Sequence, residues 1–235
     1  MPLTYYTHAR RDEPKVALTF DDGPNPPRTD EIMDILEAKG ARGTFFVLGK
    51  WVERWPQAAE RIVRRGHCIG NHSHVHHAHV GDFDRAEAVI GNLLGRPTRF
   101  LRAHYFNYFT CLYSPLAMSE SMAIVDSDVN PADYAKTDPR EIVDATLEHP
   151  SLAAGSIIDL HDSGETDDDG LRLARPLPLI AALPTIIDGL QAQGFQLVGL
   201  DQMTLVDPVE WQPDDRATYA SPEARAAVYE LGRQR

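Results

Sequence analysis

Seven strand-like runs separated by helix-like segments constrain the fold of this chain more than any other feature. The runs fall at residues 16–20, 44–48, 68–70, 98–102, 123–126, 156–160 and 195–199. Strands that alternate with helices predict a parallel sheet, either covered by helices on both faces or closed as a barrel. We therefore expect an α/β fold with about seven parallel strands.

Helix signals lie between these runs. They predict helices at 30–39, 57–65, 139 onward, 180–193 and 221 onward. The first two end at Gly40 and Gly66, and glycine is the residue that most often terminates a helix. Asp138 and Pro139 supply an N-cap and a proline at the first helical position. Pro184 predicts a kink or a break in the helix at 180–193.

Length and charge limit the class of protein. The chain has 235 residues, which suits one α/β barrel or two small domains, and it contains no low-complexity linker or repeat. We expect one catalytic domain over residues 1–235. The net charge of −12 argues against nucleic acid, which is bound through Lys and Arg, and against an anionic membrane surface. No stretch approaches the roughly 20 apolar residues of a membrane span.

The N-terminus and the cysteines bear on the compartment. Residues 1–8 lack the basic region and apolar core of a signal peptide. We therefore expect a cytoplasmic protein, or a secreted or cell-envelope protein if a leader is removed. Cys68 and Cys111 are too few for a disulfide scaffold.

Two adjacent carboxylates, Asp21 and Asp22, stand between the first run and a Gly-Pro turn. Neighbouring side chains in a strand point to opposite faces. If that alternation breaks at the turn, one carboxylate can bind a metal while the other moves a proton. The alternative interpretation is a solvated Asx turn, which Asp-Gly commonly forms.

Four further polar motifs follow the ends of predicted strands. They begin at His72, Arg102, Asn130 and Leu160. Active sites of α/β barrels lie at the carboxyl ends of the strands. The shared position of these motifs favours a catalytic site over scattered surface residues.

Histidines gather in one segment. Residues 67–79 contain six of the ten histidines of the chain. His72 and His76 are four residues apart, so one helical turn would place both imidazoles on one face. Two imidazoles and one carboxylate form a metal site with open positions, for which zinc is the default and Fe²⁺, Co²⁺ or Ni²⁺ are alternatives. We expect His67, His74, His77 and His79 to be surface residues or to support the metal ligands.

Over about residues 14–203 the chain resembles the polysaccharide deacetylase family, also called the NodB homology domain or carbohydrate esterase family 4. The resemblance is carried by the motifs at 19–24, 72–76 and 160–162 and, more loosely, by those at 102–105 and 130–134. It implies a distorted (β/α) barrel that removes N- or O-acetyl groups from carbohydrate polymers. The residues at 207–235 would then form a C-terminal tail.

The resemblance also implies roles for individual residues. Asp21 would be the general base, and Asp22, His72 and His76 would hold the metal. Arg102 would keep Asp21 ionised, because a nearby positive charge lowers the pKa of a carboxylate.

The remaining roles concern the leaving group and the oxyanion. His161 would be the general acid that protonates the leaving amine, and Asp133 is the best candidate to orient it. The backbone N–H of Tyr105 would stabilise the oxyanion.

Several positions depart from the family pattern. His104 stands where the family has proline, Phe106 where it has glycine, Asn130 at the first acid of the fourth motif and Tyr134 at its tryptophan. Asp159 replaces a leucine that helps line the pocket for the acetyl methyl, and it should face the same side as His161. We expect Asp159 to have a partner such as His104, the metal-bound water or a polar group of the substrate.

Three functions remain open on these grounds. The first is metal-dependent deacetylation of an amino-sugar polymer or oligomer. The second is hydrolysis of a different C–N or ester bond, such as that of a small amide, by the same residues. The third is non-catalytic binding of carbohydrate or metal, which an acid–base pair disfavours. The substrate, the metal and the oligomeric state do not follow from the sequence.

Overall fold

The computed structural model describes residues 3–76, 81–104, 108, 111, 114–163 and 177–210. Its strands are β1 (Thr4–Tyr5), β2 (Lys15–Gly23), β3 (Gly43–Val47), β4 (Cys68–Asn71), β5 (Phe100–Leu101), β6 (Ala123–Ile124), β7 (Ile157–His161), β8 (Gln196–Leu197) and β9 (Val209–Glu210). All seven predicted strands are present, as β2 to β8. Two further strands, β1 and β9, were not predicted; each has two residues, and they pair antiparallel with each other.

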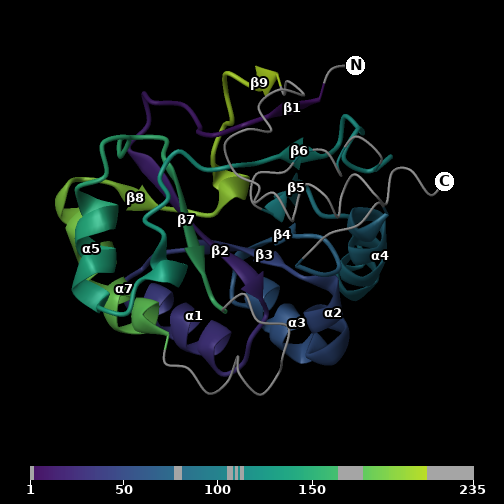
Figure 1. Cartoon of the computed structure of the whole chain (residues 1–235), viewed down its shortest axis with the longest axis horizontal. Helices are drawn as coiled ribbons and strands as arrows, with labels where there is room; N and C mark the ends of the chain where they lie inside the picture. The colour runs from purple at the N-terminus through teal and green to yellow at the C-terminus, as the bar shows by residue number, and fades with distance from the viewer. Residues whose placement is uncertain are drawn as a thin grey trace.

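The seven strands form one parallel sheet in the order β6-β5-β4-β3-β2-β7, with β8 also paired to β2 (Figure 1). The two ends of this order are brought together beyond β6, where Val129 forms a parallel bridge to Ile158 of β7. The backbone N–H of Asp159 donates to the carbonyl of Val129 at 2.9 Å. The predicted distorted barrel of parallel strands is therefore confirmed.

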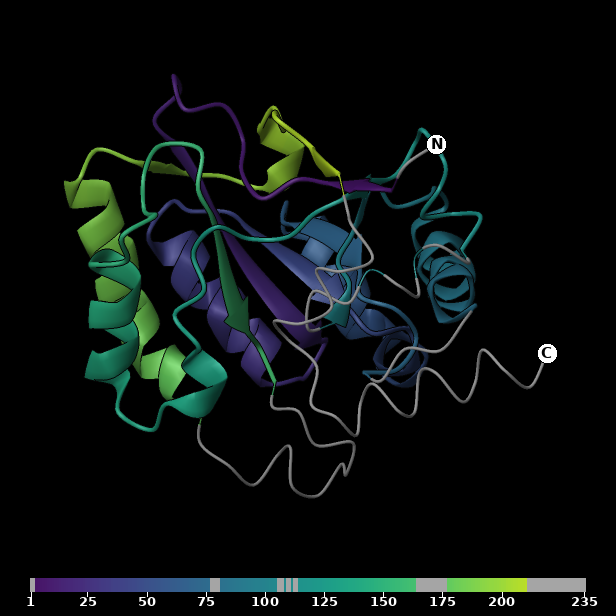
Figure 2. The ribbon, with the colours of Figure 1, turned by 45° about the horizontal axis from the view of Figure 1, so that its top comes forward.

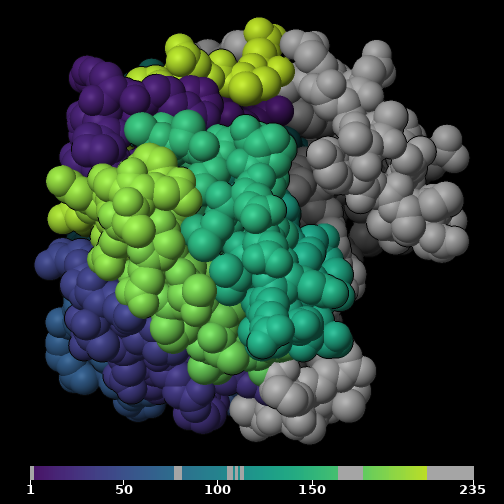
Figure 3. All heavy atoms as spheres, turned by 90° about the vertical axis from the view of Figure 1, so that its left-hand side faces the viewer, coloured from purple at the N-terminus to yellow at the C-terminus, as the bar shows by residue number. Residues whose placement is uncertain are grey.

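Helices pack around this sheet. They are α1 (Arg28–Ala38), α2 (Gly49–Arg54), α3 (Pro56–Arg64), α4 (Asp82–Leu94), α5 (Pro139–Leu147) and α7 (Pro178–Ala192), with 3₁₀ turns η3 (Asp133–Ala135) and η4 (Leu200–Gln202). In Figures 1 and 2, α5 and α7 lie on the opposite side of the sheet from α4. Figure 3 shows α5 and α7 side by side, covering one face of the molecule.

The predicted helix ends agree with the structure where it describes them. The Asp138 carboxylate caps α5 by accepting from the backbone N–H of Arg140 at 2.9 Å. Pro184 was predicted to kink or break this helix, and α7 continues through it without a break. Buried leucines and isoleucines on both sides of the proline hold the two halves in one helix. The helix predicted from residue 221 lies outside the described residues. Among those residues, no helix is long and apolar enough to cross a membrane.

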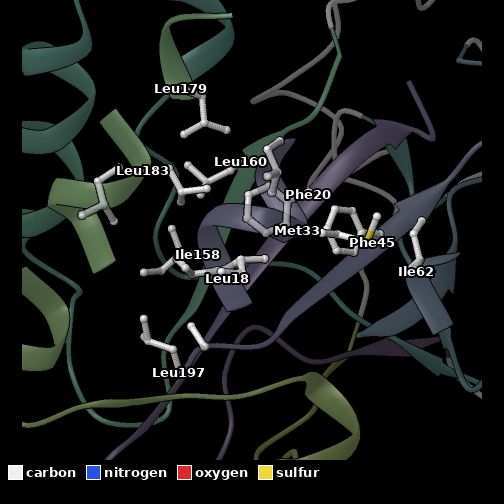
Figure 4. Packing of buried hydrophobic residues seen from close by; sticks show 14 of the residues in the cluster. Leu18, Phe20, Met33, Phe45, Ile62, Ile158, Leu160, Leu179, Leu183 and Leu197 are labelled. Carbon is white, nitrogen blue, oxygen red and sulfur yellow. The ribbon is translucent and has the colours of Figure 1, made fainter. Parts of the chain in front are cut away.

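The central strand β2 is buried along its length and divides its side chains between two environments. Leu18 and Phe20 pack with Met33 of α1 and with Leu183 of α7 in the apolar layer beneath the helices (Figure 4). Thr19 and Asp21 alternate with them and face the opposite side. The paired strand β7 repeats this division, because Thr19 lies beside Asp159, and Asp21 beside His161, in the parallel register. The fold therefore gathers polar side chains on one face at the carboxyl ends of the strands.

Candidate active site

The end of β2 brings both adjacent carboxylates into the interior. Asp22 has a φ of 76°, and the register with β3 shifts between Asp21 and Gly23. Such a bulge interrupts the alternation of side chains, so neither carboxylate has to face away from the other. Both are buried, at 3% and 1% exposure. The predicted break in alternation is present, but it lies within the strand and not in the turn that follows.

Asp162 supports this bend, a role that the sequence analysis missed. A β-carbon on Gly23 would lie 2.2 Å from an Asp162 carboxylate oxygen, so any other residue at this position would force the buried Asp162 side chain to move. The same carboxylate accepts a hydrogen bond from the hydroxyl of Thr29 at 2.6 Å. In the sequence, the position of Asp162 directly after the predicted acid His161 could have indicated a role in the site.

Two of the predicted metal ligands, His72 and His76, face one carboxylate oxygen of the third, Asp22. Asp22 Oδ1 lies 3.6 Å from His72 Nε2 and 3.6 Å from His76 Nε2. Ligands that bind one zinc ion at about 2.1 Å are separated by roughly 3–4 Å. The distance from Asp22 to each imidazole nitrogen therefore suits two ligands of one divalent metal ion.

His72 is held in the form that binds metals. Its Nδ1 lies 2.9 Å from the backbone carbonyl of Arg102, to which it must donate. Nε2 then carries the lone pair and faces the carboxylates, as in many metal-binding histidines. Burial lowers the pKa of His72 to about 4, although Asp22 opposes this shift. The ring is neutral at neutral pH, which metal binding requires.

The prediction that a helical turn presents His72 and His76 is wrong. Residues 72–76 form a bent loop after β4, with Ser73 at a φ of 72°. The Ser73 and His74 carbonyls accept hydrogen bonds from the first two N–H groups of α2, those of Gly49 and Lys50. Because these carbonyls accept hydrogen bonds from a neighbouring helix, they are not part of a helix of their own. The loop brings the two imidazoles to Asp22.

Arg102 lies buried among the acidic residues. Its Nη1 donates to Thr19 Oγ1 at 2.7 Å, to Asp21 Oδ1 at 3.0 Å and to Asp159 Oδ1 at 3.2 Å. The expected pair between Arg102 and Asp21 is present. Burial raises the pKa of Asp21 to about 6, and Arg102 opposes this shift by lowering the pKa, as expected. The net shift is nevertheless upward, because burial outweighs the Arg102 charge.

His161 and Asp133 form the second ion pair of the site. His161 Nδ1 lies 2.8 Å from Asp133 Oδ1, and the His161 backbone N–H donates to Asp133 Oδ2 at 3.0 Å. Burial disfavours the charged imidazolium, but the charge and hydrogen bond of Asp133 outweigh it and raise the pKa of His161 well above its ordinary value. His161 therefore carries a proton near neutral pH, with the Nδ1–H directed at Asp133.

Asp159 is buried and has partners, as expected. Arg102 donates to one of its oxygens, and Asn130 Nδ2 donates to the other at 3.0 Å. His104 instead lies 2.9 Å from Ser73 Oγ. The carboxylates of Asp159 and Asp21 and the His161 ring place polar atoms within 4.8 Å of one another. Asp159 therefore belongs to the same polar cluster as the predicted acid and base.

Some predicted residues lie elsewhere. Tyr105, His77 and His79 fall outside the described residues. His67 and His74 are buried at 5% and 2% exposure, so their prediction as surface groups is wrong. His67 accepts a hydrogen bond on Nδ1 from the Gly43 N–H at 3.1 Å and packs edge-on against Phe45. His67 therefore packs against β3 in the interior of the protein.

The buried position of His67 predicts a pH dependence of stability. Burial lowers its pKa from 6.5 to about 4, although Glu37 opposes the shift. Between these values the folded protein holds fewer protons on His67 than the unfolded chain, so the free energy of unfolding falls as the pH falls. Across this window we expect His67→Asn to reduce the fall by about 3 kcal/mol.

Urea unfolding of both proteins at pH values from 7 to 4 measures this difference. The Asn side chain keeps a hydrogen-bond acceptor near the Gly43 N–H. The pKa of His72 is lowered in the same way, but His72 is present in both proteins, so its contribution cancels in the difference. Parallel stability curves for the parent and His67→Asn would show that His67 does not contribute.

Known proteins resemble this chain in sequence and in fold. The polysaccharide deacetylase family model matches residues 8–110. The chain is 34% identical over 199 residues to a chitooligosaccharide deacetylase from Sinorhizobium fredii, covering 80% of this chain and 91% of that protein. It is 31% identical to a peptidoglycan-N-acetylglucosamine deacetylase from Bacillus cereus, covering 80% of this chain and 68% of that protein.

A solved structure of similar fold is that of the Bc1960 peptidoglycan N-acetylglucosamine deacetylase in complex with 4-naphthalen-1-yl-N-oxidanyl-benzamide. It has a TM-score of 0.74 at 27% identity and covers 85% of this chain and 92% of that chain. Both the sequence identity and the similarity of fold extend over most of the chain. The chain belongs to the polysaccharide deacetylase family.

Proposed function

We propose that this protein is a metal-dependent deacetylase that removes acetyl groups from an amino-sugar polymer or oligomer. The observation that carries the proposal is the pairing of Asp21 with His161 at the ends of β2 and β7. They lie beside the carboxylate and imidazoles of Asp22, His72 and His76. A buried base, a buried acid and a group of metal-binding side chains within one cluster suit hydrolysis of an amide.

The metal would be held by Asp22, His72 and His76, and zinc is the first expectation for two imidazoles and one carboxylate. When bound, such an ion supplies Lewis acidity, which polarises a carbonyl and lowers the pKa of an attacking water. These side chains fit the ion because the two imidazole nitrogens face one oxygen of Asp22 at 3.6 Å.

Asp21 would accept the proton of the attacking water. Its pKa of about 6 leaves it ionised at neutral pH while keeping it a stronger base than an exposed carboxylate. Arg102 holds one of its oxygens at 3.0 Å, and the other lies 3.5 Å from His72 Nε2. The carboxylate is therefore fixed in place beside the metal-binding side chains.

His161 would donate a proton to the departing nitrogen. Asp133 accepts from Nδ1, so the proton on Nε2 is the one directed away from Asp133. From the family resemblance we also propose that the backbone N–H of Tyr105 donates to the oxyanion of the tetrahedral intermediate. Preorganised donors at an oxyanion commonly supply several kcal/mol of the reduction in the barrier.

An amino sugar is supported as the substrate by the relatives and by the rim of the site. The similar proteins from S. fredii and B. cereus carry the names of chitooligosaccharide and peptidoglycan deacetylases. Tyr134 is 52% exposed, and its ring lies 5.1 Å from that of His161. An exposed aromatic ring at this position offers an apolar face to a sugar ring.

Release of acetate from a defined panel tests this function. Metal-loaded protein is incubated with chitooligosaccharides, peptidoglycan fragments, acetylxylan and simple amides, and the acid released is quantified. We expect acetate from the N-acetylated sugars. Acid release from the simple amides alone would favour hydrolysis of a small amide over deacetylation of a sugar. No acid release from any member of the panel would contradict both activities.

Asp159 favours a second candidate, the removal of an acyl group more polar than acetyl. Its carboxylate lies close to both Asp21 and His161. A charged group in this position offers little to an apolar methyl, whereas it can accept a hydrogen bond from a polar substituent. This candidate and the deacetylase use the same catalytic residues and differ only in the acyl group that is removed.

Replacing Asp159 is expected to change acyl selectivity. Asp159→Leu makes this part of the site more apolar, so the ratio of activity on N-acetyl to that on N-formyl sugars should rise about 4-fold, the value of one buried methyl. Asp159→Asn is the matched control, because it keeps the shape of the side chain. Initial rates on the two sugars measure the ratio. An unchanged ratio in Asp159→Leu would show that the acyl group does not contact this position.

A further inference from the structure

His104 lies among the metal-binding side chains, yet the proposed reaction gives it no role. It is buried at 7% exposure. Its ring centroid lies 3.8 Å from that of His72 and 4.6 Å from that of His76. Three imidazoles therefore crowd together beside Asp22.

The contacts of Ser73 determine which nitrogen of His104 carries the proton. The Ser73 hydroxyl donates to the carbonyl of Val75 at 2.6 Å, and a hydroxyl has only one proton to donate. It can only accept from His104 Nε2, which lies 2.9 Å away. Nε2 of a neutral His104 is therefore protonated, and the lone pair is on Nδ1.

This arrangement repeats the one at His72. Each ring donates one N–H to a protein oxygen, the Arg102 carbonyl for His72 and the Ser73 hydroxyl for His104. Metal-binding histidines characteristically donate their second nitrogen in this way. Asp22, His72 and His104 also place one possible ligand atom each within 4.8 Å of one another. Atoms bound to one ion at about 2.1 Å lie at most about 4.2 Å apart, so small rotations of the rings suffice.

We propose that His104 is a further ligand of the metal ion, contributing Nδ1 beside Asp22, His72 and His76. The inference rests on the proposed metal site. Four protein ligands exhaust a tetrahedral zinc ion, whereas ions that accept five or six ligands keep positions for water and substrate. The site would thus favour Co²⁺, Ni²⁺ or Fe²⁺ over Zn²⁺ more strongly than a site with three ligands.

Metal affinity of variants tests the proposal. His104→Phe keeps a ring in the cluster and removes both nitrogens. His74→Phe is the matched control, because His74 is also a buried histidine, and its Nε2 lies 3.8 Å from a Glu53 carboxylate oxygen. Competition with a chromogenic chelator should show that His104→Phe binds Co²⁺ at least about 100-fold more weakly than the parent, beyond the roughly 10- to 100-fold loss expected for a residue that only supports a ligand. His74→Phe should bind within about 2-fold of the parent, and the loss in His104→Phe should be larger for Co²⁺ than for Zn²⁺.

The number of bound imidazoles can be counted on the parent protein itself. In the Co²⁺ form, each histidine ligand contributes one exchangeable N–H proton to the paramagnetically shifted proton NMR spectrum. We expect three such signals in the parent and two in His104→Phe. Two signals in the parent, or equal Co²⁺ affinity of the parent and His104→Phe, would overturn the proposal. The count in the parent decides the question if the variant does not fold.

The outcome is separate from that of the proposed function. Three signals without acetate release would support His104 as a ligand and contradict the deacetylase. Acetate release with two signals would support the deacetylase and contradict His104 as a ligand.

Discussion

Asp21→Asn and His161→Ala are each expected to lower the turnover number at least about 100-fold, with the metal content unchanged. Asn keeps the shape of Asp21 but cannot accept the proton of water, and Ala removes the imidazole that Asp133 holds at 2.8 Å. Neither side chain belongs to the proposed ligands Asp22, His72 and His76. Steady-state assays of acetate release, together with metal analysis of each purified variant, measure both quantities.

Asp188→Asn is the control for this pair of variants. Asp188 is an exposed carboxylate on α7 that pairs with Lys39, and it is not one of the residues assigned to the site. It should retain the activity of the parent. Full activity in Asp21→Asn or in His161→Ala would show that the acid and the base are assigned to the wrong residues.

His72→Ala is expected to reduce metal affinity at least about 100-fold, beyond the 10- to 100-fold typical of residues that only support a ligand. The parent should hold about one divalent ion per chain, lose activity to a chelator and regain it with Zn²⁺ or Co²⁺. The reason is the position of His72 Nε2, which lies within 3.6 Å of both Asp21 and Asp22 oxygens. Equilibrium dialysis with metal analysis measures the stoichiometry and the affinity.

His149→Ala is a suitable control for His72→Ala, because His149 lies after α5 and contacts Ser151. Its replacement should leave the affinity unchanged. If His72→Ala binds metal as tightly as the parent, the metal site proposed at the end of β2 is wrong.

The strands and the positions of the motifs were predictable from the sequence. Apolar runs of strand length depend on neighbouring residues alone, and all seven appear as β2 to β8. The placement of Asp21 and His161 at the same end of the sheet also follows, since parallel strands share their carboxyl edge. The unusual bend at Asp22 was visible as two acids before Gly-Pro.

Contacts between distant segments decided the rest. The spacing of His72 and His76 suits a helical turn, but residues 72–76 form a loop, because N–H groups of α2 donate hydrogen bonds to two of its carbonyls. Asp159 found its partners in Arg102 and Asn130, which come from other strand ends. Burial reversed the expected shift in the pKa of Asp21. The sequence by itself thus determined which residues stand at the strand ends, because periodicity is local. Only the tertiary structure decided their partners, protonation and desolvation, because these depend on which distant segments pack together.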